Sequence, residues 1–192
     1  SPQGTVMQGV AESVSYSDSD IILCRTNRPL IAHAYDLLKR GIACHVRGRD
    51  IGEGLVRLIN KHGAPDVSTL IDCLIDWKDV ELTKARKRED EHKIQSVNDK
   101  YDSVMVFITK CKLTDSPQVV IDNINSLFEQ GKGVCLSTVH KAKGLEADAA
   151  YLLQHELFDS FYAKSKHSYQ KEQEKNCKYV AVTRAKTQLT YM

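Results

Sequence analysis

Seven consecutive residues, 138 to 144, bring together side chains that suit a phosphate group. They include a hydroxyl on Thr138, an imidazole on His140, two lysines and a glycine, and they lie between two apolar runs. Such groups bind phosphate oxygens and the nucleic-acid backbone, and Gly144 lacks the Cβ that keeps backbone away from a ligand. In an extended chain Thr138 and His140 would share one face. We interpret the segment as a ligand-binding loop; the alternative for each residue taken singly is a solvated turn.

Two arginines lie where a cation needs a partner. Arg25 follows the apolar run DIILC and would emerge at the carboxyl end of a strand; the alternative is that residues 25–27 form only a turn with a helix cap. On a helix, Arg184 would share a face with the apolar residues 177, 180 and 181. A buried cation must either extend its charged end to water or find an anion. The fixed fork of an arginine suits a phosphate.

Alternating strands and helices must position these groups. Short apolar runs predict strands over residues 20–24, 42–46 and 188–192 and on both sides of the loop at 138–144. Helical spacing of apolar residues, with Pro29 and Gly41 as start and stop signals, predicts the first of several intervening helices. This order predicts an α/β fold, a mostly parallel sheet with helices on both faces. Ligands of such sheets gather at the carboxyl ends of the strands.

The middle of the chain is highly charged. Residues 77–100 include seven basic and six acidic side chains, and later apolar residues keep helical spacing. We therefore divide the chain into a first part of the α/β domain (1–65), a helical, highly charged insertion (66–115) and a second part of the α/β domain (116–192). The formal net charge is only +2, so any polyanion site must be local.

Several classes of protein are disfavoured. The six cysteines form no Cys-x-x-Cys pair, which argues against a zinc site or a disulfide-stapled secreted domain and favours a cytoplasmic protein. No apolar run approaches the roughly 18 residues that span a bilayer, so we expect no membrane partner. No Gly-x-x-x-x-Gly-Lys-Ser/Thr sequence occurs, so this chain would not hold a nucleoside triphosphate in the P-loop manner. Because the chain begins with Ser1, we expect it to have been cut from a longer protein.

Three segments resemble the C-terminal half of superfamily 1 DNA helicases of the UvrD/Rep/PcrA type. ILCRTN (22–27) is similar to their motif IV, LSTVHKAKGLEAD (136–148) to motif V, and EKNCKYVAVTRAK (174–186) to motif VI. The resemblance implies a RecA-like fold, the second of two motor domains with ATP and Mg²⁺ in the cleft between them. The partners it implies are single-stranded DNA and the N-terminal RecA-like domain of the same polypeptide.

The resemblance also implies a role for individual residues. Arg25 and Arg184 would be catalytic and reach the γ-phosphate. ATP would be bound by Lys143, Gly144 and Glu146, and the Glu146 carboxylate would accept a hydrogen bond from a ribose hydroxyl. The DNA backbone would be contacted by Thr138 and His140. The full-length protein would be an ATP-dependent 3′-to-5′ helicase, and this chain alone would be inactive. The alternatives are a non-catalytic DNA-binding or partner-docking module that kept the fold, and the motor part of a helicase–nuclease fusion.

Overall fold

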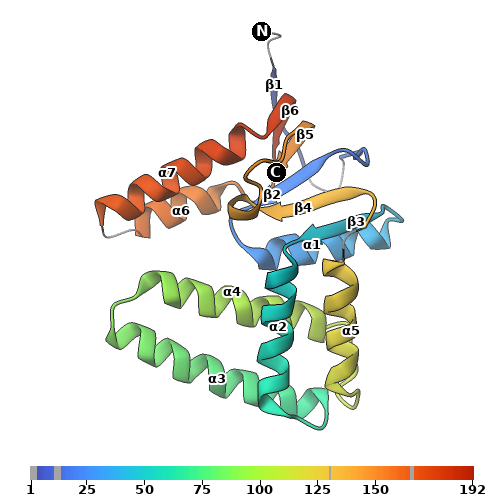
Figure 1. The fold of residues 1–192 in the computed structure, drawn as a ribbon, viewed down its shortest axis with the longest axis vertical. Coiled ribbons are helices and arrows are strands. Elements are labelled where there is room, and N and C mark those ends of the chain that lie inside the picture. Colours follow the sequence, from blue (N-terminus) through green and yellow to red (C-terminus); the bar gives the residue numbers. More distant parts are fainter. Residues whose placement is uncertain (1–3, 11–13, 130, 165–166) are drawn as a thin grey trace. The chain divides into compact units, whose positions relative to one another are not determined.

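The computed structural model describes residues 4–10, 14–129, 131–164 and 167–192, and the chain divides into two compact units (Figure 1). The sheet unit contains residues 1–47 and 130–192, and the helical unit contains residues 48–129. The helical unit thus extends beyond the charged segment 66–115 at both ends. Among the described helices, none is long and apolar enough to cross a membrane.

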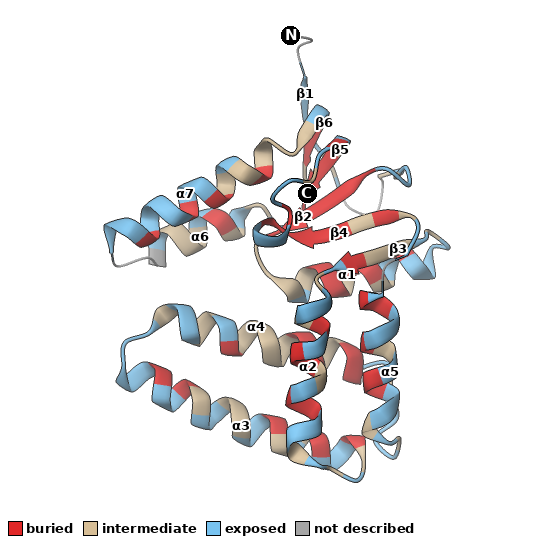
Figure 2. Cartoon of the chain, in the orientation of Figure 1, coloured by how far each residue is buried: buried red, intermediate tan, exposed pale blue. Residues whose placement is uncertain are grey.

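The sheet unit is built on six parallel strands in the order β1-β6-β5-β2-β4-β3. The predicted α/β fold with a parallel sheet is therefore confirmed. β2 at the centre is buried along its whole length (Figure 2). β1, the outermost strand on one side, is exposed throughout, so its sequence shows no pattern of buried residues that would predict a strand. The strands are β1 (Thr5–Gln8), β2 (Ile21–Cys24), β3 (Cys44–Arg47), β4 (Val134–Thr138), β5 (Ala147–Leu152) and β6 (Ala185–Tyr191).

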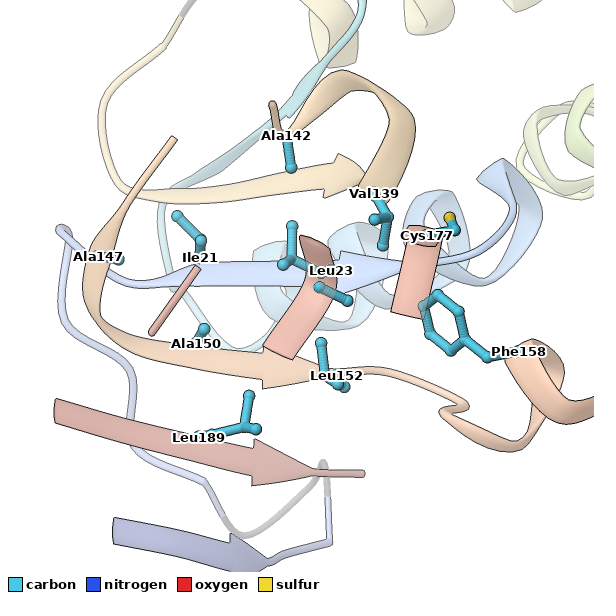
Figure 3. Close-up of a cluster of buried hydrophobic side chains, with 11 residues drawn as sticks. Ile21, Leu23, Val139, Ala142, Ala147, Ala150, Leu152, Phe158, Cys177 and Leu189 are labelled. Atoms are coloured by element: carbon cyan, nitrogen blue, oxygen red, sulfur yellow. The ribbon is translucent and has the colours of Figure 1, made fainter. Parts of the chain in front are cut away.

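Helices cover both faces of this sheet, as predicted. Ile21 and Leu23 on one face of β2 pack with Phe158 of α6 (Glu156–Lys164) and Cys177 of α7 (Ser168–Val182), as Figure 3 shows. Since successive side chains of a strand point to opposite faces, Ile22 points to the other face. There α1 (Asn27–Lys39) lies against β2, β3 and β4.

The helical unit consists of four helices: α2 (Arg49–His62), α3 (Val67–Lys87), α4 (Glu91–Ile108) and α5 (Pro117–Phe128). The charged segment forms the hairpin of α3 and α4, and the carboxylates of Asp66 and Asp90 cap the first turns of these helices. α2 and α5 belong to the unit because they pack closely: a Cβ on Gly52 of α2 would lie 3.0 Å from the side chain of Phe128.

Gly133 fixes the entry to β4, and we expect Gly133→Ala to lower the free energy of unfolding by more than about 3 kcal/mol. Its φ is +91°, and an added Cβ would overlap the backbone carbonyl of Ala43. Gly41→Ala is the matched control, because Gly41 also has a positive φ, +74°, but open space around it; it should cost only about 1 kcal/mol. Urea denaturation of both variants measures the difference, and equal losses would contradict the role of the overlap.

Candidate functional site

The parallel strands all end along the same side of the sheet, and we call this line of strand ends the carboxyl edge. Three of the predicted residues lie there, at the ends of β2 and β4. Cys24 and Thr138 are in register at these ends, so Arg25 follows at the same level. Thr138 is buried, but the chain then turns into a 3₁₀ helix over Val139–Lys141, and His140 is exposed. The expectation that Thr138 and His140 share one face is therefore wrong, because the extended chain ends between them.

Arg25 is held inside the protein by a carboxylate that the sequence did not single out. Its Nε and Nη2 donate to Oε2 and Oε1 of Glu174 at 2.9 and 2.6 Å. The two side chains are only 11% and 1% exposed, and the guanidinium lies 4.3 Å above the ring centre of Phe161. A two-bond fork of this kind fixes the orientation of the guanidinium as well as its position. We call this Arg25–Glu174 pair the buried clamp.

Next to the buried clamp, His140 meets α7. Its Nε2 lies 3.8 Å from Sγ of Cys177, one helical turn after Glu174. Burial raises the pKa of the Cys177 thiol to about 11, and Glu174 adds to this effect while Arg25 opposes it. The thiol is therefore neutral at physiological pH and serves as a packing residue, because nucleophilic chemistry requires the thiolate.

From His140 the loop crosses to the opposite edge of the sheet, the amino edge, where β5 and β6 begin. Lys143, Gly144 and Glu146 are all exposed there. Gly144 has a φ of +84°, a backbone conformation that favours glycine. The Glu146 carboxylate lies 3.8 Å from Nζ of Lys186 at the start of β6, an exposed pair that constrains neither side chain strongly. The carboxylate of Glu146, the ammonium group of Lys143 and the backbone at Gly144 are thus all exposed to solvent at the amino edge.

Arg184 lies at this amino edge too, although not on the helix that its spacing predicted. α7 ends at Val182, and Arg184 follows the C-cap residue Thr183. Its guanidinium donates to the carbonyls of Val180 and Leu145, each at 3.0 Å, and to the Thr183 hydroxyl at 3.0 Å. The guanidinium is half-buried and donates to carbonyl oxygens and a hydroxyl of its own chain, and these bonds fix its orientation at the amino edge.

The structure therefore separates the predicted residues into two groups. Arg25, Thr138 and His140 lie at the carboxyl edge, whereas the residues from Lys143 to Glu146 and Arg184 lie at the amino edge. In Figure 3, Cys177 marks the first edge and Ala147 the second. Along α7, Glu174 and Val182 are eight residues apart, a rise of about 12 Å. The two predicted arginine fingers are not brought together.

Two elements, the loop 139–146 and α7, connect the edges and run side by side over one face of the sheet. His140 near the start of the loop contacts Cys177 in the second half of α7, and Leu145 near the end of the loop accepts from Arg184, two residues past the helix. Val139 and Ala142 of the loop pack with Cys177 and Ala181 in the buried core between these contacts.

Sequence reasoning missed Glu174 and Phe161. One signal could have found Glu174: residues 170, 174, 177 and 181 follow helical spacing and form the buried face of α7, so a carboxylate on that face requires a partner. Phe161 belongs to α6, which the polar composition after Ser160 concealed.

No cluster of three or more His, Cys, Asp or Glu side chains suited to a metal occurs among the described residues. Comparison with protein families matches residues 56–192, more than half of the chain, to the UvrD-like helicase C-terminal domain. No curated protein matches the chain.

Proposed function

The chain belongs to the family of UvrD-like helicase C-terminal domains, and from this premise we propose that it is the second half of an ATP-driven motor on single-stranded DNA. ATP and Mg²⁺ would be held mainly by an N-terminal RecA-like domain, because the sequence here contains no Gly-x-x-x-x-Gly-Lys-Ser/Thr loop. The observation that carries the proposal is the guanidinium of Arg184, which three hydrogen bonds orient beside the loop that bears Glu146.

We assign the amino edge to the nucleotide. During phosphoryl transfer negative charge develops on the γ-phosphate oxygens, and a fixed cation stabilises it without reorganising at the moment of reaction. Arg184 suits this role because three hydrogen bonds hold its side chain. Glu146 would accept a ribose hydroxyl, and the exposed backbone at Gly144 with the ammonium of Lys143 would lie near the phosphates. The buried clamp supports assigning the arginine finger to Arg184 and not to Arg25.

We assign the carboxyl edge to the DNA. The exposed imidazole of His140 can contact a phosphate or sugar without reading a base, which suits a motor that must move along any sequence. The side chain of Thr138 is buried, so we expect it to act on DNA only indirectly, by positioning the backbone of the 3₁₀ turn that follows it. The 3′-to-5′ direction is proposed from the family alone.

The distribution of charge supports a local polyanion site. The sheet unit contains fifteen Lys and Arg against ten Asp and Glu, a formal charge of +5, and the helical unit contains twelve against fifteen, a formal charge of −3. The modest net charge of the chain therefore hides a basic sheet unit. An excess of positive charge in this unit favours binding to the nucleic-acid backbone.

ATP hydrolysis by the full-length protein, with and without oligothymidine, tests the motor. We expect turnover to rise on addition of the oligonucleotide and the 192-residue chain alone to be inactive. Absence of any ATPase activity, together with a gene that encodes no phosphate-binding loop upstream of Ser1, would favour a DNA-binding or partner-docking scaffold.

Replacing His140 with alanine in the full-length protein should weaken binding to fluorescent oligothymidine about fivefold, the effect of about 1 kcal/mol expected from one lost hydrogen bond. His92→Ala is the matched control, because His92 is an exposed histidine of the helical unit. Fluorescence anisotropy at a fixed salt concentration measures both variants. Equal affinities, with unchanged stimulation of ATP turnover, would remove His140 from the DNA site.

A further inference from the structure

The two edges of the sheet unit are connected by the second half of α7, and the buried clamp holds this helix near its middle. Glu174 lies in the first half of α7 and Arg184 follows its last residue. Glu174 binds the residue directly after β2, 149 positions earlier in the chain. The position of α7 over the sheet is therefore set at the carboxyl edge by the buried clamp and at the amino edge by the bonds of Arg184.

Two further contacts join α7 and its C-terminal flank to the loop 139–146, whose first part is assigned to DNA and whose last part is assigned to the nucleotide. Cys177 of α7 touches the imidazole of His140, and Arg184 donates to the carbonyl of Leu145 in the same loop. A displacement of His140 by a bound strand would therefore act on α7 near Glu174. Because the core between the two contacts is packed and buried, such a displacement would be transmitted along the helix rather than absorbed.

We propose that Glu174 is a positioning residue for Arg184: by gripping Arg25 it anchors α7 at the carboxyl edge, so that DNA bound there sets the position of Arg184 at the amino edge. This inference rests on the proposed function. The two-bond contact requires a carboxylate, since a neutral amide at position 174 offers only one acceptor oxygen to the two donors of Arg25.

Glu174→Gln in the full-length protein tests this role. The side chain keeps its size, and only the charge and one acceptor are lost. We expect ATP turnover without DNA and the Kd for oligothymidine to stay within about twofold of wild type, while stimulation of turnover by oligothymidine falls at least about tenfold. A merely structural role would not change this ratio of stimulated to unstimulated turnover.

Glu172→Gln is the matched control, because it removes an exposed carboxylate from the same helix, two residues away, and stimulation should be that of wild type. Wild-type stimulation in Glu174→Gln would overturn the inference, as would a fall in stimulated and unstimulated turnover by the same factor. Should Glu174→Gln prove too unstable to purify, Glu174→Asp keeps the charge but shortens the reach; stimulation unchanged in that variant would overturn the inference, and loss of stimulation alone would support it.

The proposed function and the positioning role of Glu174 can be contradicted by different results. If Arg184→Ala retains DNA-stimulated turnover, the motor assignment of the amino edge is wrong whatever Glu174 does. If Arg184 is required and Glu174→Gln is stimulated normally, only the positioning role is lost.

Discussion

Arg184→Ala is expected to lower DNA-stimulated ATP turnover of the full-length protein by a factor of about 10³ to 10⁵, the range typical of a lost arginine finger. The loss should appear mainly in kcat, because an arginine finger stabilises the charge distribution of the transition state more strongly than that of bound ATP. Affinity for oligothymidine should change little, since Arg184 lies at the amino edge and the DNA contacts lie at the carboxyl edge. Steady-state ATPase assays with saturating DNA measure the effect.

Stability must be measured beside activity, because Arg184 also donates three hydrogen bonds within the chain. Arg184→Lys keeps the charge but loses the fork and should be nearly as inactive. Lys175→Ala, which removes a cation from an exposed position of α7, should behave as wild type. If Arg184→Ala kept turnover within tenfold of wild type, its guanidinium would serve only to tie Leu145 to the end of α7.

Arg25→Ala is expected to lower the free energy of unfolding of the 192-residue chain by about 3 to 5 kcal/mol, the usual result of leaving one member of a buried ion pair alone. Glu174, 1% exposed, would lose both of its bonds to Arg25 and could not reach water. Urea denaturation followed by circular dichroism measures the loss.

The double variant Arg25→Met with Glu174→Leu separates charge from packing. Apolar residues of similar volume commonly replace a buried ion pair at little cost, so stability should return to within about 1 kcal/mol of wild type. Breaking the exposed pair between Lys178 and Asp159 with Lys178→Ala should cost less than about 1 kcal/mol. If Arg25→Ala cost no more than this control, Glu174 would have to find another partner, and the buried clamp would not hold α7.

Strands of the sheet were predictable where their burial requires a recognisable pattern of apolar residues. β2 is buried on both faces and reads as an unbroken apolar run, the mark of a central parallel strand. β1 is exposed throughout and is fixed by backbone pairing with β6, which any sequence can supply. The helical character of the charged segment was predictable from its apolar spacing, whereas the limits of the helical unit depend on packing between α2 and α5 that spacing alone does not reveal.

The candidate site was predictable as residue types and not as an arrangement. The loop after β4 and the position of Arg25 after a strand followed from local pattern, whereas Arg184 was expected on a helix and lies just past the end of α7. That Arg25 would be gripped by Glu174 did not, because a contact across 149 residues depends on how α7 packs. That the arginines lie at opposite edges follows from which end of a strand each one adjoins: Arg25 follows β2 and Arg184 precedes β6.

The division of the chain has a consequence for the order of folding. β3 and β4 are neighbours in the sheet, yet the whole helical unit, residues 48–129, is synthesised between them. On the ribosome the sheet must therefore wait for β4 while the helical unit, whose contacts are local, can form. Its prior folding replaces a long flexible loop by a compact one and reduces the entropy cost of closing β3 onto β4. Destabilising α2 or α5 is thus expected to slow formation of the sheet in which neither helix takes part.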